Sequence, residues 1–379
     1  MPLVLNEEQR LLKETAREFL ASNAPVDALR KLRDNKDKTG YCQNTWQKMA
    51  ELGWAGITIP QAYGGLEFGA LGLGAIIEES GRTLAASPLL ATVALCANII
   101  ELASNENQKQ QYLPEIASGK ISLALALEES VHHNPSNIAL TAEKQDSGFL
   151  LSGKKCFVVD GHSADYLIVV ARTSDRVNDR DGISLFIVDP ATSGIKRSRT
   201  IFADSRNVAN IEFDNVTISD VNLIGELDNG WEALDRALDR ARIYLAAEML
   251  GGANECFERT MQYLKEREQF GVKIGSFQAL KHRAAKIFVD LELARSAVLD
   301  ALSAIDENRA DLAQMASLAK TLLNDTYYLV TNEAVQMHGG IGVTDELDIG
   351  LFLKRSRVAI QLLGDSGFHK DRYASLCGY

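Results

Sequence analysis

The sequence predicts an α+β protein in three consecutive parts: a helical segment, a β segment and a second helical segment. Residues 1–120 carry apolar residues at helical spacing, whereas residues 121–225 contain short β-branched and aromatic runs separated by turns. Residues 226–379 return to helical spacing, and no glycine or proline occurs between Ser276 and His338. These observations predict two helical parts on either side of an antiparallel β-barrel in the chain order.

Length and composition predict an ordinary globular protein. The chain has 379 residues, of which 46% are hydrophobic and 24% charged, so a large core can form. No apolar run approaches the ~20 residues that span a membrane, and the start MPLVLNEEQR lacks the features of a signal peptide. Because the net charge is −11, a nucleic-acid-binding surface is not expected. We therefore expect a cytoplasmic protein with no membrane or nucleic-acid partner.

The cysteines give no sign of a metal site. They are five in number and widely separated, and they show neither a CxxC pair nor the Cys/His spacing of metal ligands. The sequence therefore predicts reduced thiols and no bound metal.

The first helix has a predictable start. Asn6 and Gln9 have the spacing of a capping box, in which each side chain binds the backbone amide of the other residue. Leu12, Ala16 and Leu20 then repeat on one face. This pattern predicts a helix that packs against others.

The β segment consists of strands with no helix between them. The runs are FLLSG, KCFVVDG, DYLIVVART, GISLFIVDP and NIEFDNVTI, and Asp146-Ser147-Gly148 suits a hairpin turn. Strands spaced this closely favour an antiparallel barrel or sandwich over a parallel sheet. Of these two, we predict the barrel.

The stretch QMHGGIGVTDE, from Gln336 to Glu346, ends the long helical region with three glycines within four residues. Glycine allows positive φ and lets backbone amides approach a phosphate closely. A plain helix-terminating loop explains the same residues. Taken alone, the glycine run therefore leaves both interpretations open.

A second segment, REREQFGVKIGSFQALKH, strengthens the phosphate interpretation. Arg267 can hold a pyrophosphate through two parallel hydrogen bonds, and Phe270 offers a flat apolar face. The alternative is a surface ion pair for Arg267 and a core position for Phe270.

Together, REREQFGVKIGSFQ and QMHGGIGVTDELDIGLFLKR resemble the acyl-CoA dehydrogenase family of flavoproteins. The resemblance extends from about Asn6 to Tyr373 and includes the ITIPQAYGG turn. It implies the three-domain plan of that family: an N-terminal helical domain at 1–120, a middle β domain covering the flavin at 121–225, and a C-terminal helical bundle at 226–379.

The resemblance also implies FAD as the cofactor. Arg267, Phe270 and Gln278 match family positions that contact the adenine and pyrophosphate part of FAD, typically from a neighbouring subunit. A site of that kind implies an oligomer, and the usual form in the family is a tetramer. The loop that receives the same part of FAD is matched by Gln336, Met337, His338, Gly339 and Gly340.

In the middle domain, the resemblance places Phe157 and Val159 beside the flavin ring. The family usually has a threonine where Val159 stands, and valine has no hydroxyl to bind the flavin. Leu127 and Glu129 stand where the other flavin-facing strand usually has threonine and proline. Backbone contacts survive such changes, and an ordinary apolar β core is the alternative interpretation of both strands.

The family removes two hydrogens from neighbouring carbons of an acyl-CoA thioester. A carboxylate takes the α proton as general base, and the β hydrogen leaves as hydride to the flavin N5. Here, Gly364 and Ala241 occupy the two usual glutamate positions. Both positions therefore lack the base.

Three explanations are open. Asp365, next to Gly364, can act as base from a shifted loop. Glu248, further along the helix of Ala241, is a second candidate, although helix packing or an ion pair explains it more simply. The third is that a homologous partner chain supplies the glutamate. Arg242, beside Ala241, can contact substrate or pair with a neighbouring carboxylate.

The sequence thus predicts an FAD-dependent acyl-CoA dehydrogenase, either a homotetramer or the β-type subunit of an α2β2 heterotetramer. LLGDSGFH and KCFVVDGHSADYLIVVART resemble the base-lacking subunits of bacterial enzymes acting on steroid side chains or on dicarboxylic acyl-CoA. The alternative is a catalytically silent subunit that holds FAD for its partner. An electron-transferring flavoprotein is the implied acceptor, with molecular oxygen as the oxidase alternative.

Overall fold

The computed structural model describes residues 4–174 and 176–379. Contacts divide the chain into two compact units. The helical unit comprises the chain up to Lys31, Ala70–Ala85 and Arg242–Tyr379. The sheet unit comprises Leu32–Gly69 and Ala86–Ala241. The predicted order of helical, β and helical segments is confirmed, whereas the domain boundaries near residues 120 and 225 stay predictions.

The helices follow the predicted apolar spacing. They are α1 (Glu7–Asn23), α2 (Val26–Asp34), α3 (Gln43–Glu51), α4 (Ala70–Thr83), α5 (Ala97–Ala103), α6 (Glu106–Ala117), α7 (Trp231–Glu266), α8 (Gln278–Asp306), α9 (Leu312–His338), α10 (Ile349–Gln361) and α11 (Ser366–Leu376), together with a π-helix at Leu89–Cys96. Helices α2 and α7 cross the division between the units. Among the described residues, no helix combines the length and apolar character that crossing a membrane requires.

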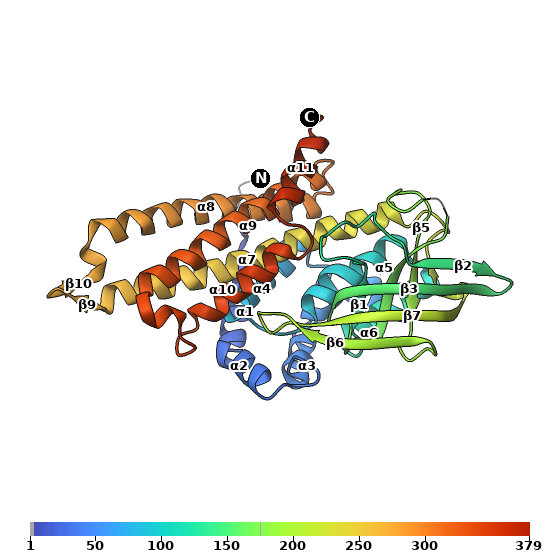
Figure 1. The fold of residues 1–379 in the computed structure, drawn as a ribbon, viewed down its shortest axis with the longest axis horizontal. Coiled ribbons are helices and arrows are strands. Elements are labelled where there is room, and N and C mark those ends of the chain that lie inside the picture. The colour runs from blue at the N-terminus through green and yellow to red at the C-terminus, as the bar shows by residue number, and fades with distance from the viewer. Residues whose placement is uncertain (1–3, 175) are drawn as a thin grey trace. The chain divides into compact units, whose positions relative to one another are not determined.

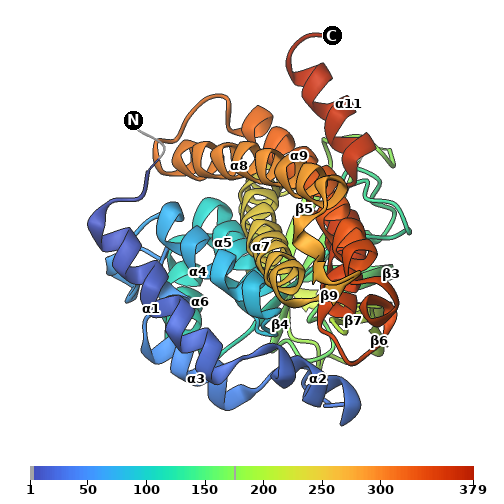
Figure 2. The same cartoon turned by 90° about the vertical axis from the view of Figure 1, so that its left-hand side faces the viewer.

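Two local predictions for the helices are confirmed. Asn6 and Gln9 form the capping box of α1, because the Asn6 side chain accepts from the Gln9 amide at 2.8 Å and the Gln9 side chain accepts from the Asn6 amide at 2.9 Å. Along α9, Leu312, Ala316 and Leu323 are buried at helical spacing. Helix α9 contacts α8, α10 and α11, so this stripe lies inside a bundle, and α8 and α9 run side by side (Figures 1 and 2).

The strands form one eight-stranded sheet and a small hairpin. They are β1 (Leu123–Ala126), β2 (Thr141–Gln145), β3 (Gly148–Val159), β4 (Tyr166–Arg172), β5 (Ile183–Val188), β6 (Ile195–Ile201), β7 (Asn207–Ser219), β8 (Leu223–Ile224), β9 (Glu268–Gln269) and β10 (Val272–Lys273). Strands β2 and β3 pair antiparallel with Gln145 opposite Gly148, so the predicted hairpin turn is confirmed.

The barrel prediction is confirmed only as a sheet. The pairing order runs β6-β7-β3-β2-β4-β5-β8, and within the described residues no pairing joins β6 to β8. Moreover, β1 and β2 each pair parallel with β4. Apolar alternation identifies strands and their buried faces, but it does not identify their partners, so neither feature could be predicted.

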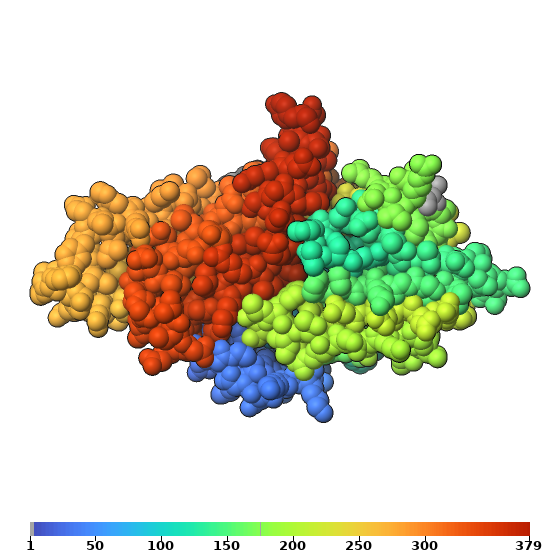
Figure 3. Space-filling view, viewed as in Figure 1, coloured from blue at the N-terminus to red at the C-terminus, as the bar shows by residue number. Residues whose placement is uncertain are grey.

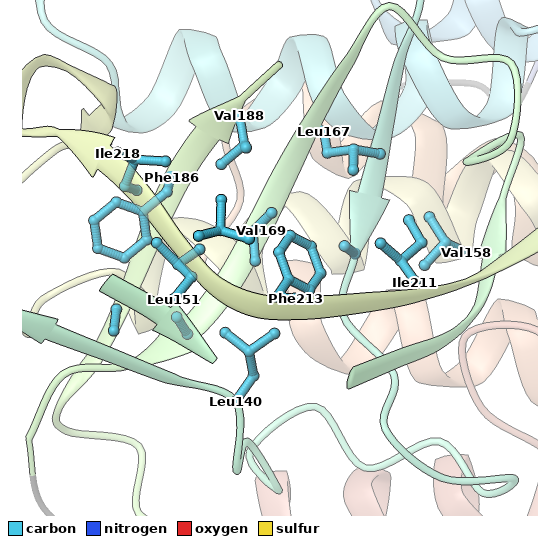
Figure 4. Packing of buried hydrophobic residues seen from close by; sticks show 14 of the residues in the cluster. Leu140, Leu151, Val158, Leu167, Val169, Phe186, Val188, Ile211, Phe213 and Ile218 are labelled. Atoms are coloured by element: carbon cyan, nitrogen blue, oxygen red, sulfur yellow. The ribbon is translucent and has the colours of Figure 1, made fainter. Parts of the chain in front are cut away.

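The core of the sheet unit explains why these apolar runs fold as strands. Phe149 of β3 and Phe186 of β5 meet with ring centroids 4.9 Å apart. Leu151, Val169 and Phe213 are also buried in this cluster (Figure 4). Full burial of such side chains stabilises the fold by about 1.5–3 kcal/mol each, which makes this cluster a rigid base for the loops around it.

Within the helical unit, α4 and α7 approach so closely that only glycine fits. A Cβ on Gly251 would lie 1.7 Å from the carbonyl oxygen of Glu78, and a Cβ on Gly81 would lie 1.9 Å from that of Glu248. Both distances are far inside van der Waals contact. The two backbones therefore pack directly against each other.

We predict that Gly251→Ala lowers the free energy of unfolding by about 1–3 kcal/mol, because the added methyl forces the helices apart. Chemical denaturation measures this difference. Gly350→Ala in α10 is the matched control, since a Cβ there meets only the Thr344 carbonyl oxygen, at 3.9 Å. Equal effects of the two substitutions would contradict the close packing.

Candidate functional site

The turn between α10 and α11 has no room for a side chain at residue 364. Leu363 and Gly364 both have positive φ, 58° and 111°. A Cβ on Gly364 would lie 2.5 Å from a ring carbon of Phe368 and 2.7 Å from Nε2 of His369. The left-handed backbone and the two rings therefore exclude a glutamate at this position unless the turn rearranges.

The amine of Lys320 holds this turn from inside the helical unit. Lys320 is fully buried, and its Nζ donates to the carbonyl oxygens of Gly364 at 3.1 Å and Ala359 at 3.0 Å. The side chain of Asn324 accepts a third bond at 2.6 Å. Burial, together with the nearby charge of Arg242, holds the pKa of Lys320 well below its usual value.

Arg242 packs against the same turn. Its guanidinium is fully buried, donates from Nε to the Leu363 carbonyl oxygen at 3.3 Å and lies 5.5 Å from the centre of the Phe368 ring. Nε2 of His369 lies 3.0 Å from the same carbonyl oxygen. Basic groups thus surround the usual glutamate position, and a substrate contact by Arg242 stays a prediction.

The two carboxylates considered as bases both have structural partners. Asp365 is the N-cap of α11, and its Oδ1 accepts from the Phe368 amide at 2.8 Å. Glu248 accepts from Nη1 of Arg355 at 2.9 Å, and both side chains are buried. The ion-pair interpretation of Glu248 is therefore confirmed, while catalysis by Asp365 stays a prediction. Ala241, at the other usual position, is fully buried.

The hairpin of β9 and β10 presents the predicted nucleotide-binding residues to solvent. Phe270 has φ 55° and is 91% exposed, so it does not belong to the core. Its ring meets Phe277 edge-on at 6.2 Å. Arg267 is exposed, and its side chain has no hydrogen bond or ion pair within the described part of the chain. The hairpin forms the orange tip of the helical unit (Figure 3).

Helix α8 begins beside this hairpin without a side-chain cap. Gln278 is its first residue, and the side chain of the N-cap Phe277 offers no acceptor to the first amides. Such amides carry the positive end of the helix dipole and favour an anion. The hairpin and the start of α8 together therefore suit a phosphate.

The glycine loop divides the predicted residues into exposed and buried ones. Helix α9 ends at His338, and Gly339 follows with φ 66°. A Cβ on Gly339 or Gly340 would meet nothing within 4 Å, so this backbone faces open space. Gln336 is exposed, but Met337 and His338 are buried, and the His338 ring stacks on Tyr263 at 4.4 Å. Only the backbone of these two buried residues can contact a ligand.

In the sheet unit, Phe157 lies in a bulge of β3. It has φ 53°, its amide donates to the Asn210 side chain at 3.1 Å, and its ring lies 5.7 Å from that of Phe202. Val159 ends β3 and is half-buried. The bulge thus interrupts the regular hydrogen-bond pairing of β3 with β7. The sequence pattern of the strand did not predict this interruption.

Leu127 and Glu129 follow β1 and are fixed by a lysine that sequence reasoning missed. Lys155 is buried in β3, and its Nζ donates to the Leu127 carbonyl oxygen at 3.0 Å and to Glu129 at 2.7 Å. Glu129 also accepts from the amides of Ala139 and Leu140. A lysine inside an apolar strand run was the signal for this ion pair.

Comparison with known protein families decides the identity of the fold. Three family models match in chain order: the N-terminal domain of acyl-CoA dehydrogenase at residues 6–120, the middle domain at 124–216 and the C-terminal domain at 228–375. The chain belongs to the acyl-CoA dehydrogenase family.

Two curated relatives cover most of this acyl-CoA dehydrogenase family member. Mitochondrial isovaleryl-CoA dehydrogenase of Pongo abelii is 31% identical over 93% of this chain and 85% of its own length. The CarC subunit of the caffeyl-CoA reductase-Etf complex of Acetobacterium woodii is 28% identical over 94% of each chain.

Two solved structures resemble this chain over nearly its whole length. A structure described as a Tcur3481-Tcur3483 steroid ACAD variant is 30% identical, with a TM-score of 0.88 over 98% of both chains. A structure of PigA with FAD and proline is 25% identical, with a TM-score of 0.91, covering 100% of this chain and 99% of the other.

Asp160 is a further residue of the predicted flavin-facing segment that sequence reasoning missed. It follows Val159, has φ 57° and is partly buried. Burial raises its pKa to about 7, and Arg206 partly offsets this effect. The pKa of Asp160 is higher in the folded than in the unfolded protein. Protonated Asp160 therefore contributes to the stability of the fold at acid pH, and this contribution is lost as the pH rises towards 7.

We predict that Asp160→Asn stabilises the protein by about 1–2 kcal/mol at pH 8 and leaves its stability nearly unchanged at pH 4. Asparagine tolerates the left-handed conformation and removes the buried charge. Denaturant unfolding at the two pH values provides the measurement. A gain of the same size at both would rule out the charge as its cause.

Proposed function

We propose that this chain binds FAD and acts as an acyl-CoA dehydrogenase subunit in a heteromer, with the catalytic glutamate supplied by a homologous partner chain. The observation that carries the proposal is the turn at Gly364. Its left-handed backbone, the ring contacts and the Lys320 hydrogen bonds leave no place for the usual base. The nearby carboxylate of Asp365 is used to cap α11.

Three surface features support FAD binding. Arg267 offers a guanidinium without a competing partner among the described residues, the start of α8 offers amides without a side-chain cap, and Gly339 and Gly340 leave room for a ligand to approach the backbone. Each is a feature that holds a diphosphate. When bound, FAD supplies the acceptor for the hydride from the substrate. The residues Gln278, Gln336, Leu127, Phe157 and Val159 complete the proposed set of contacts.

An oligomer accounts for the apolar surface of the helical unit. Phe288, Val289 and Leu293 of α8 are each more than half exposed, as is Phe270 at the hairpin tip. Exposed aromatic and aliphatic groups gathered on one helix and its adjoining hairpin are typical of a subunit interface. A tetramer of two chain types, α2β2, is therefore proposed over a monomer.

The substrate and the electron acceptor are proposed from the family. The names of the relatives refer to acyl-CoA substrates and, for CarC, to an Etf complex. We propose an acyl-CoA thioester as substrate and an electron-transferring flavoprotein as acceptor. The steroid ACAD description of the 30% identical structure makes steroid acyl-CoA a suitable first test substrate.

A second candidate is a homotetrameric dehydrogenase in which Asp365 is the base. Asp365 lies one residue from the usual position. Its Oδ1 accepts the hydrogen bond from the Phe368 amide, and Oδ2 takes no part in that bond. Activity would then require the turn to shift. This candidate differs from the heteromer in one respect that can be measured, because the isolated chain would be active.

We predict that Arg267→Gln weakens FAD binding about 10- to 100-fold, since a charged hydrogen bond contributes about 1.5–3 kcal/mol. Titration of the flavin-free chain with FAD, followed by flavin fluorescence, gives the dissociation constant. Arg10→Gln in α1 is the matched control, because Arg10 is equally exposed and far along the chain from the hairpin. Equal dissociation constants for both variants would remove Arg267 from the site.

We predict that the isolated chain binds FAD but does not oxidise acyl-CoA thioesters with an artificial electron acceptor. Asp365→Asn should change neither result, because asparagine retains the N-cap of α11. Addition of a homologous chain that carries the glutamate should then restore turnover. Turnover by the isolated chain that Asp365→Asn abolishes would instead establish the second candidate and overturn the heteromer.

A further inference from the structure

The sheet unit contains a cavity that the proposed dehydrogenase chemistry does not use. It has a volume of about 510 Å³ and lies where the start of α3, the start of β1 and the turn before β4 meet. All of its lining residues belong to the sheet unit. Its size is within the range of about 300–1,000 Å³ that is typical of small-molecule sites.

The charges around the cavity favour a cation. Asp165 lines it, and the hydrogen bonds that Asp165 accepts from the amide and hydroxyl of Ser122, at 2.7 and 2.9 Å, both go to Oδ2. Lys120 is the basic residue of the lining, but its Nζ lies 3.2 Å from Oε1 of Glu115, which compensates its charge. The Asp165 carboxylate therefore keeps acceptor capacity and negative charge at the cavity wall.

Tyr41 lies at the wall of the same cavity, near the carboxylates of Asp160 and Asp165. Burial and, secondarily, the charges of Asp160 and Asp165 raise its pKa to about 12. The hydroxyl thus stays protonated across the physiological range.

The remaining lining is suited to an organic cation rather than a bare metal ion. Tyr41 and Trp46 contribute aromatic rings, and Gln43, Asn44 and Gln47 contribute carboxamides. Aromatic rings attract ammonium groups, and carboxamide oxygens accept their hydrogen bonds. A metal ion would instead favour several carboxylates, and Asp165 is the single carboxylate among the lining residues.

We propose that this cavity binds a small organic ammonium ion, with Asp165 as its counter-ion. The ammonium group lies against the carboxylate, and the carbon chain of the ligand lies against the aromatic rings. This proposal is independent of FAD and of the missing base. The two ideas can therefore fail separately.

The test uses the full-length chain and isothermal titration calorimetry with 1,4-diaminobutane. 1,4-Butanediol and succinate serve as the neutral and anionic probes of similar length. Asp165→Asn keeps an acceptor for Ser122 but removes the charge, and Gln47→Lys places a positive charge at the exposed rim. Gln61→Lys, at an exposed position of the sheet unit outside the lining, is the matched control.

We expect the diamine to bind at least tenfold more tightly than either other probe, and both cavity variants to weaken it at least tenfold while Gln61→Lys does not. FAD affinity should be the same in all four proteins. If Asp165→Asn fails to fold, Gln47→Lys decides the question alone. Absence of diamine binding, equal binding of the diol or succinate, or undiminished binding in Gln47→Lys would each overturn the proposal.

Discussion

The hydrogen bonds of the buried Lys320 amine determine what the helical unit can do. Two of its acceptors are backbone carbonyls, that of Ala359 at the end of α10 and that of Gly364 in the following turn. A buried amine without acceptors would cost several kcal/mol, so this conformation of the turn satisfies the lysine as much as the lysine fixes the turn. Residue 364, one of the two positions where the family resemblance places the base, is therefore part of the structural core here.

The surroundings of that turn would also oppose a base chemically. Arg242 and His369 both contact the Leu363 carbonyl oxygen. A general base for a weakly acidic carbon needs a pKa raised towards the working pH, whereas a neighbouring guanidinium such as that of Arg242 lowers the pKa of a carboxylate. The turn therefore supports α11, and its surroundings favour the proposal that another chain supplies the base.

Local features of the fold were predictable because neighbouring residues produce them. The Asn6 and Gln9 box, the stripe along α9 and the hairpin at Asp146 each depend on residues within a few positions of one another. The parallel pairing of β1 with β4 and the open sheet depend on distant strands, and sequence periodicity does not determine these partners. Exposure of Phe270 and Gly339 agreed with the family resemblance. The link from Lys320 to Gly364 joins residues 44 positions apart and had no local signal.

The helical unit has a buried, hydrogen-bonded interior at Lys320 and an exposed surface at the hairpin and the glycine loop. The buried Lys320 amine is bonded to the Asn324 side chain and to backbone carbonyls, whereas Phe270 is 91% exposed and a Cβ on Gly339 would meet nothing within 4 Å. An apolar ring that is 91% exposed, on a residue with positive φ, gains little from its own chain to offset the cost of that conformation. The exposure of the hairpin and the glycine loop therefore supports the proposal that a ligand or a second chain contacts them, and the helices behind them hold both segments in position.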